Sequence, residues 1–208
     1  MNIARGALTR PRPISNGMKQ FNRFTIKAQE ALQNAQDLAS LRNHGEFKAI
    51  HLLSSLMADE QSLIRPLLLK SGVNLDALHQ AVEVELQKMP KNFGGANVSQ
   101  MYLSQELIQL LDKAAKIALS QKDEFVSCEH LLLSIADSSS AARVILDKFG
   151  FKRDVALRTL AHLRGSARVT DEMPETKFQV LEKYAINVTD KAREGKLDPV
   201  IGREEELR

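Results

Sequence analysis

The chain has 208 residues, room for one or two domains, and is 43% hydrophobic but only 5% aromatic. A core poor in aromatic residues and rich in Leu and Ala is typical of helical proteins. The net charge of +3, from 29 basic and 26 acidic residues, argues against nucleic-acid binding, and no apolar run reaches the ~20 residues of a membrane span. A single cysteine excludes an internal disulfide and fits a reducing compartment, so we expect a cytoplasmic protein.

The segment from Met1 to Gly17 differs from the rest of the chain, since it contains three arginines and two prolines but no acidic residue. Three interpretations are open: an organelle-targeting segment, an extension upstream of a true start at Met18, or a disordered natural arm. We favour the last two, because Pro11 and Pro13 disfavour the amphipathic helix of a targeting peptide. Residues 1–20 are therefore assigned to a disordered extension.

Apolar residues then recur with helical spacing, and four helices are predicted in repeat one, residues 25–88. Thr25 caps the first helix, which ends at Asn43-His44-Gly45. The other three cover residues 47–58, 62–71 and 75–88.

A polar linker over residues 89–102 leads to repeat two, residues 104–164, where four more helices are predicted. Ser104 caps the first of them. The second runs from Ser127 to Ala136, the third from Ser139 or Ser140 to Gly150, and the fourth over 153–163.

The two stretches are copies of one another. His51-Leu52-Leu53 recurs as His130-Leu131-Leu132, and Glu46-Phe47 recurs as Glu124-Phe125. The offsets of these two matches differ by one position, so on this alignment the segment between Phe47 and His51 is one residue short. We predict an all-α fold of two pseudo-repeated four-helix units, with a pseudo-twofold axis and a groove where the halves meet.

The segment after repeat two is polar and carries Pro174, which predicts a flexible linker over residues 165–176. Short helices are expected at 177–184 and after Thr189. The chain then ends on Asp198-Pro199-Val200-Ile201-Gly202-Arg203 and a few charged residues, so we interpret 177–208 as the truncated start of a further domain.

The run Gly195-Lys196-Leu197-Asp198-Pro199-Val200-Ile201-Gly202-Arg203 resembles the junction that enters the first ATPase domain of Clp-family AAA+ unfoldases. The linker Arg168-Val169-Thr170-Asp171, followed by Leu181-Glu182-Lys183-Tyr184, resembles that of the ClpB-type disaggregases. The likeness covers the chain from about Phe21 to Arg208. It implies that residues 21–164 recognise exposed apolar segments of unfolded or aggregated polypeptides and deliver them to a hexamer pore. The alternative is a docking domain for an adaptor protein, as in protease-coupled Clp unfoldases.

The resemblance further implies a longer parent protein: a homohexamer with a coiled-coil insertion, ATP and Mg as cofactors, and a DnaK-type chaperone system as partner. Val200 and Ile201 would line the adenine pocket there. This chain contains no Gly-x-x-x-x-Gly-Lys-Ser/Thr phosphate loop, so by itself we expect it to hold no cofactor and not to be an enzyme. The resemblance implies that ring contacts come from the ATPase domains, so we also expect a monomer.

Three residues match positions that the resemblance implicates in substrate handling: Thr25, Asp123 and Glu129. An alternative stays open, in which Thr25 is only a helix cap and the two acids sit at a helix start and complement its dipole. Glu129 precedes His130 in repeat two, whereas Ile50 precedes His51 in repeat one, so the two repeats are not equivalent as binding sites. We favour repeat two.

The paired histidines His51 and His130 suggest a metal site, but no second pair stands at ligand spacing. We interpret them as packing residues that bond a backbone carbonyl. The sequence shows no base and no orienting group that would activate Cys128 as a nucleophile. We therefore interpret Cys128 as a small buried residue.

Overall fold

The structure is a computed structural model that describes residues 23–92, 102–164, 168–170 and 172–173. Those residues form eight helices and two strands, each strand a single dipeptide, so the all-α prediction is confirmed. The helices begin and end close to their predicted bounds. The elements are α1 (Ile26–Leu41), β1 (Glu46–Phe47), α2 (Ala49–Ala58), α3 (Ile64–Lys70), α4 (Leu75–Lys88), β2 (Tyr102–Leu103), α5 (Gln105–Ser120), α6 (Cys128–Ala136), α7 (Ala141–Lys148) and α8 (Arg153–Arg164).

Several sequence predictions lie outside the described residues. They are the extension at 1–20, the helices at 177–184 and after Thr189, and the adenine-pocket residues Val200 and Ile201.

The first helices of the two repeats begin in the same way. The Thr25 hydroxyl accepts the Ala28 N–H at 3.2 Å, and the Ser104 hydroxyl accepts the Leu107 N–H at 3.1 Å. Each bond satisfies an amide that the first turn of a helix leaves without a partner. The predicted caps are therefore confirmed.

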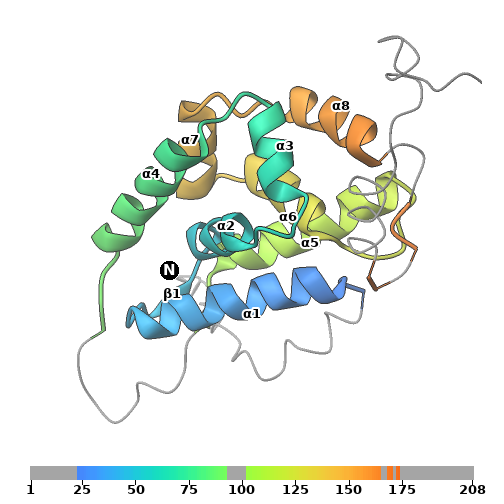
Figure 1. The fold of residues 1–208 in the computed structure, drawn as a ribbon. Coiled ribbons are helices and arrows are strands. Elements are labelled where there is room, and N and C mark those ends of the chain that lie inside the picture. The colour runs from blue at the N-terminus through green and yellow to red at the C-terminus, as the bar shows by residue number, and fades with distance from the viewer. Residues whose placement is uncertain (1–22, 93–101, 165–167, 171, 174–208) are drawn as a thin grey trace, which may run out of the picture. The chain divides into compact units, whose positions relative to one another are not determined.

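The second helix of each repeat lies at the centre of the described helical domain (Figure 1). Every residue of α2 from Ala49 to Met57 is buried, and so is every residue of α6 from Cys128 to Ile135. A helix that is buried all round is a core element. Helix α1 packs on α2 and α5 on α6, while α4 packs on α7 and α3 on α8 of the other repeat. The repeats thus share one hydrophobic core.

The repeats also exchange short extended segments. Strand β1 pairs in parallel with β2, which places Phe47 opposite Leu103. Its counterpart is an isolated parallel bridge between Phe24 and Val126. The distance along the chain from Phe24 to Leu103 equals that from Phe47 to Val126, so the two pairs are equivalent under the duplication.

This register corrects the sequence alignment. Phe47 corresponds to Val126 rather than to Phe125, and no residue is missing before α2. The N-cap residues Lys48 and Ser127 each stand at the same position relative to the histidine of their helix. The one-residue difference comes later, since α2 has 10 residues and α6 has 9. A shared Glu-Phe dipeptide suggested the wrong register, because strand pairing between the repeats is invisible in sequence.

The described part of the chain after α8 does not leave the domain freely. Residues 168–170, 172 and 173, which we call the exit strap, lie beside the start of α1 (Figure 1). The described strap residues are held by main-chain hydrogen bonds. The flexible linker over residues 165–176 stays a prediction. No helix within the described ranges is long and apolar enough to cross a membrane.

Candidate functional site

Four ionisable side chains of repeat two lie close together, and one of them bonds the exit strap. We call them the charged cluster: Asp123, Glu129, His130 and Arg164. The carboxylate Oδ2 of Asp123 lies 3.0 Å from Arg164 Nη2 and 3.0 Å from His130 Nε2. Arg164 Nε lies 3.5 Å from Glu129 Oε1. All four residues are buried. The cluster joins the start of α6 to the last residue of α8.

The protonation of His130 follows from its hydrogen bonds. The Ser127 backbone N–H donates to Nδ1 at 3.0 Å, so the neutral ring carries its proton on Nε2, the nitrogen that lies 3.0 Å from Asp123 Oδ2. Burial by itself would raise the pKa of Asp123. The hydrogen bonds from His130 and the Val169 N–H, with the Arg164 charge, outweigh it and lower that pKa.

Glu129 is the least satisfied member of the charged cluster. It is 1% exposed, and neither carboxylate oxygen has a hydrogen-bond partner in the described part of the chain. The Arg164 guanidinium supplies the compensating positive charge. Burial of this acid therefore depends on Arg164.

Repeat one has no such charges. The residues at the equivalent positions are His44, Ile50 and Leu86, which replace Asp123, Glu129 and Arg164. There the His51 Nδ1 accepts the Lys48 N–H at 3.1 Å, and the rings of His44 and His51 bond through Nδ1 and Nε2 at 2.8 Å.

The predicted substrate residues are brought together, but not on a surface. Thr25 is fully buried, and Asp123 and Glu129 are 5% and 1% exposed. The Thr25 N–H donates at 2.9 Å to the carbonyl of Val126, which lies in the same loop as Asp123. Arg164 lies against both acids, and the exit strap bonds Asp123 through the Val169 N–H. The role of the three residues in substrate handling stays a prediction. Asp123 also does not begin a helix, since α6 starts at Cys128.

The exit strap is anchored by its main chain. The Val169 N–H donates to Asp123 Oδ1 at 2.8 Å, and the Val169 carbonyl accepts the N–H groups of Glu124 and Phe125 at 2.9 and 3.3 Å. The Glu172 carbonyl accepts the Ile26 N–H at 2.9 Å. Val169 is fully buried, while the residues on either side of it are exposed.

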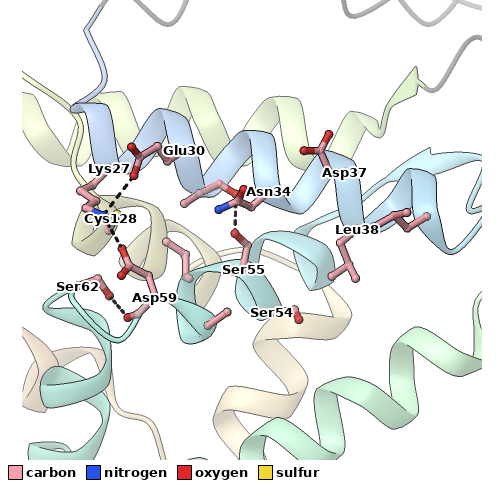
Figure 2. A pocket seen from close by; sticks show the side chains of 14 residues that line it. Lys27, Glu30, Asn34, Asp37, Leu38, Ser54, Ser55, Asp59, Ser62 and Cys128 are labelled. Atoms are coloured by element: carbon pink, nitrogen blue, oxygen red, sulfur yellow. Dashed lines mark hydrogen bonds and ion pairs between the residues drawn. The ribbon is translucent and has the colours of Figure 1, made fainter.

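A groove of about 580 Å³ runs between α1 and α2, and we call it the α1–α2 groove (Figure 2). Its apolar side chains include Ala31, Leu38, Leu56 and Leu41, the last 82% exposed. Three acids and one base line it: Glu30, Asp37, Asp59 and Lys27. The α1–α2 groove is therefore lined by apolar and small polar side chains, the latter including Asn34, Ser54 and Ser55, together with three acids and one base.

One end of the α1–α2 groove is held by an ion-pair bridge. Lys27 Nζ lies 3.2 Å from Glu30 Oε2 on its own helix and 3.5 Å from Asp59 Oδ2 beyond the end of α2. Burial would lower the Lys27 pKa, but the two carboxylates prevail and raise it. Asp37 lies near the other end of α1 (Figure 2), where it accepts a hydrogen bond from the neutral Gln33 side chain at 2.9 Å.

Repeat two has an equivalent but smaller groove of about 260 Å³ between α5 and the loop after α6. Leu110 stands there in place of Ala31, and Lys113 in place of Asn34. The Lys113 ammonium donates to the Asp137 carbonyl at 2.5 Å and crosses the gap.

The larger groove therefore lies in repeat one, whereas the sequence favours repeat two as the binding site. The sequence feature that corresponds to this groove is the small size of the side chains of Ala31, Ser54 and Ser55. That signal becomes visible only once the helices are paired.

The described residues contain no cluster of three His, Cys, Asp or Glu side chains able to hold a metal ion. His51 and His130 lie in separate repeats, and each accepts the N–H of its N-cap residue. The predicted carbonyl partner is wrong for His130, whose Nδ1 faces donors of Ser127. Cys128 is buried, as predicted.

Comparison with known proteins agrees with this architecture. The family model described as the Clp repeat (R) N-terminal domain matches residues 23–149. The chaperone protein ClpB of Bacillus cereus is 36% identical over 189 residues, which are 90% of this chain and 22% of the relative. The chain thus spans about a fifth of the length of this curated relative.

Solved structures share the fold. The Hsp104 N-terminal domain from Candida albicans is 23% identical with a TM-score of 0.66, and the match covers 74% of this chain and 99% of that one. The ClpV N-domain in complex with a VipB peptide is 19% identical with a TM-score of 0.56, covering 74% and 93%. Since the family model matches more than half of the 208 residues, the chain belongs to the Clp repeat N-terminal domain family.

Proposed function

We propose that this domain binds exposed apolar segments of unfolded polypeptides in the α1–α2 groove and presents them to an ATP-driven disaggregase. The family is a non-catalytic substrate- or adaptor-binding module of Clp chaperones. The observation that carries the proposal is the shape and charge of the α1–α2 groove. Its volume of about 580 Å³ is within the range of ligand sites, and exposed Leu41 extends its apolar surface.

The charges that line the α1–α2 groove indicate which polypeptide segments it should prefer. Three carboxylates against one ammonium favour segments in which basic residues flank apolar ones. The smaller groove of repeat two is lined by two acids, Glu106 and Asp137, and two bases, Lys113 and Arg143, so it lacks this preference. Binding should weaken as salt rises, because the acids lie at solvent-facing edges.

The experiment introduces the residues of repeat two into repeat one. Asp37→Lys with Leu41→Ser changes two exposed positions to their counterparts Lys116 and Ser120. We expect about tenfold weaker binding of a labelled, reduced and carboxymethylated protein in fluorescence anisotropy, equivalent to about 1.4 kcal/mol. The matched control is Asp76→Lys with Leu69→Ser, the same changes at exposed positions outside the α1–α2 groove. Equal affinity of the two double variants would contradict the proposal.

Docking of one specific partner is the second candidate. A fold relative, the ClpV N-domain, is described in complex with a VipB peptide, which shows that the fold can hold a defined sequence. A panel of unrelated apolar-basic peptides separates the candidates. Similar micromolar affinities across the panel support client capture, whereas one tight binder among many non-binders supports adaptor docking.

In the longer protein, we propose that six such domains surround the pore of a homohexamer whose ATPase domains use ATP and Mg, with a DnaK-type chaperone system as partner. Six weak sites on one ring would hold a client by avidity without new contacts.

A further inference from the structure

We propose that the exit strap occupies a second polypeptide-binding site, and that an extended peptide with an aliphatic side chain competes with it for the edge formed by Asp123, Glu124 and Phe125. This site is distinct from the α1–α2 groove and does not depend on it. The strap is its internal ligand, so an external segment that binds there releases the connection that follows α8.

The contacts of the strap define the ligand chemistry. Three hydrogen bonds join the Val169 amide and carbonyl to residues 123–125, and a fourth joins the Glu172 carbonyl to Ile26. These bonds use only main-chain atoms of the strap, so any extended polypeptide can make them. The one strap side chain that the structure describes as buried is Val169, and it sets the requirement for an aliphatic residue.

The acceptor side of the site stays in place without the strap. Oδ2 of Asp123 is held by Arg164 and His130, both from the domain itself. That leaves Oδ1 directed at the strap amide. On the opposite side, Val126 is bonded to Arg23 and Thr25, which fixes the edge from behind. A preformed edge with fixed donors and acceptors lowers the ordering cost of binding.

Repeat one shows what distinguishes this site. There the chain after α4 also returns to the loop before the second helix, where the Asn92 N–H donates to the Asn43 carbonyl at 2.8 Å and Lys91 pairs with His44. His44 directs Nδ1 at His51, so it offers no carboxylate to accept an incoming amide. Asp123 supplies that acceptor in repeat two.

The test uses the full chain and a labelled peptide that covers residues 165–173. In the wild type the tethered strap competes at an effective concentration that short linkers place in the millimolar range. Val169→Lys weakens the strap, so we expect the variant to bind the peptide at least tenfold more tightly than the wild type does. Thr170→Lys makes the same charge change at an exposed strap position and should leave the affinity at the wild-type value.

Three further measurements complete the experiment. A peptide with Lys in place of Val169 should not bind any variant. Saturation of the wild type with the native peptide should speed hydrogen exchange at the Val169 amide, because the strap is displaced. Asp37→Lys with Leu41→Ser should bind the strap peptide normally, which separates this site from the α1–α2 groove.

If Val169→Lys fails to fold, Val169→Pro keeps an apolar residue and removes the N–H that donates to Asp123, so it should give the same gain. Equal peptide affinity in the wild type and in a folded Val169 variant overturns the proposal. So does peptide binding that leaves hydrogen exchange at the Val169 amide unchanged, because that peptide does not displace the strap.

Discussion

At the scale of single residues, the charged cluster distinguishes repeat two from repeat one. Asp123, Glu129 and Arg164 are buried where repeat one has His44, Ile50 and Leu86. A buried charge is costly unless it is paired, so the three residues depend on one another. Acids at an exposed helix start would contribute only about 0.3–1 kcal/mol each, and the burial of these two predicts a larger effect.

Arg164→Leu should lower the free energy of unfolding by about 3–5 kcal/mol, because two buried carboxylates lose their counter-charge. The triple variant Asp123→His, Glu129→Ile, Arg164→Leu imports the residues of repeat one and should recover most of that loss. Urea denaturation measures both. Arg158→Leu, at an exposed position on the same helix, is the control and should change stability by under about 0.5 kcal/mol. A triple variant as unstable as the single one would contradict the argument.

The histidine pair of repeat one predicts a dependence of stability on pH. Burial, and then the neighbouring His44, lower the pKa of His51 to about 4, and burial also lowers the pKa of His44. Below the usual histidine pKa of about 6.5, His44 and His51 bind protons in the unfolded chain but stay neutral in the folded chain. Stability is therefore highest above pH ~6.5 and falls as the pH drops towards 4.

For His51 alone the shift corresponds to about 3 kcal/mol across that range. The lowered pKa of Asp123 acts separately, since its contribution is lost only below about pH 4. Chemical denaturation at pH 7.5, 6 and 4.5 measures the trend. His51→Gln should be less stable at pH 7.5 but show a flatter profile, and an unchanged slope would rule out this pair as the cause.

At the scale of elements, the ends of α1 and α5 carry a matched pair of backbone conformations. Asn43 has φ of 56° and Lys122 has φ of 61°, and the two positions are equivalent in the repeats. The left-handed region is accessible to Asn at little cost but disfavours Lys.

Lys122→Gly should therefore raise the free energy of unfolding by about 0.5–1 kcal/mol, or a few degrees in Tm, because the glycine relieves that backbone strain. Asn43→Gly at the equivalent site should have a smaller effect. Differential scanning calorimetry compares the two. A greater gain from Asn43→Gly would mean that the side chain of Lys122 stabilises its turn in some other way.

At the scale of the whole described domain, the repeats are intertwined. Helices α3 and α4 pack on α8 and α7 of the other repeat, and each repeat pairs an extended segment with its twin. The buried leucines of α2 and α6 belong to one core.

A chain of residues 23–92 alone should consequently be unfolded, since α2 and α4 would expose surfaces that repeat two covers. Circular dichroism at 222 nm should show little helix in this fragment, and amide hydrogen exchange should show little protection. The full chain should unfold in one cooperative step. An independently folded half, with a sharp thermal transition of its own, would overturn this view of the core.

The sequence determined the helices, their caps and their duplication. Those features depend on residues three or four positions apart, such as Thr25 and the Ala28 amide, so local patterns suffice. Sequence likeness also indicated the family, which the comparisons confirm. The family resemblance assigned Thr25, Asp123 and Glu129 to substrate handling, but it did not indicate that their side chains are buried.

The environment of those residues depends on contacts between segments that are distant in sequence. Asp123 is covered because the Arg164 side chain and the Val169 amide, both distant from it in sequence, come to meet it. The pairing of Phe24 with Val126 likewise fixed the register of the repeats. The volume of the α1–α2 groove depends on which small side chains face each other across two helices. Burial, ion pairing and cavity size are properties of contacts between distant segments, and a pattern along the chain carries no record of them.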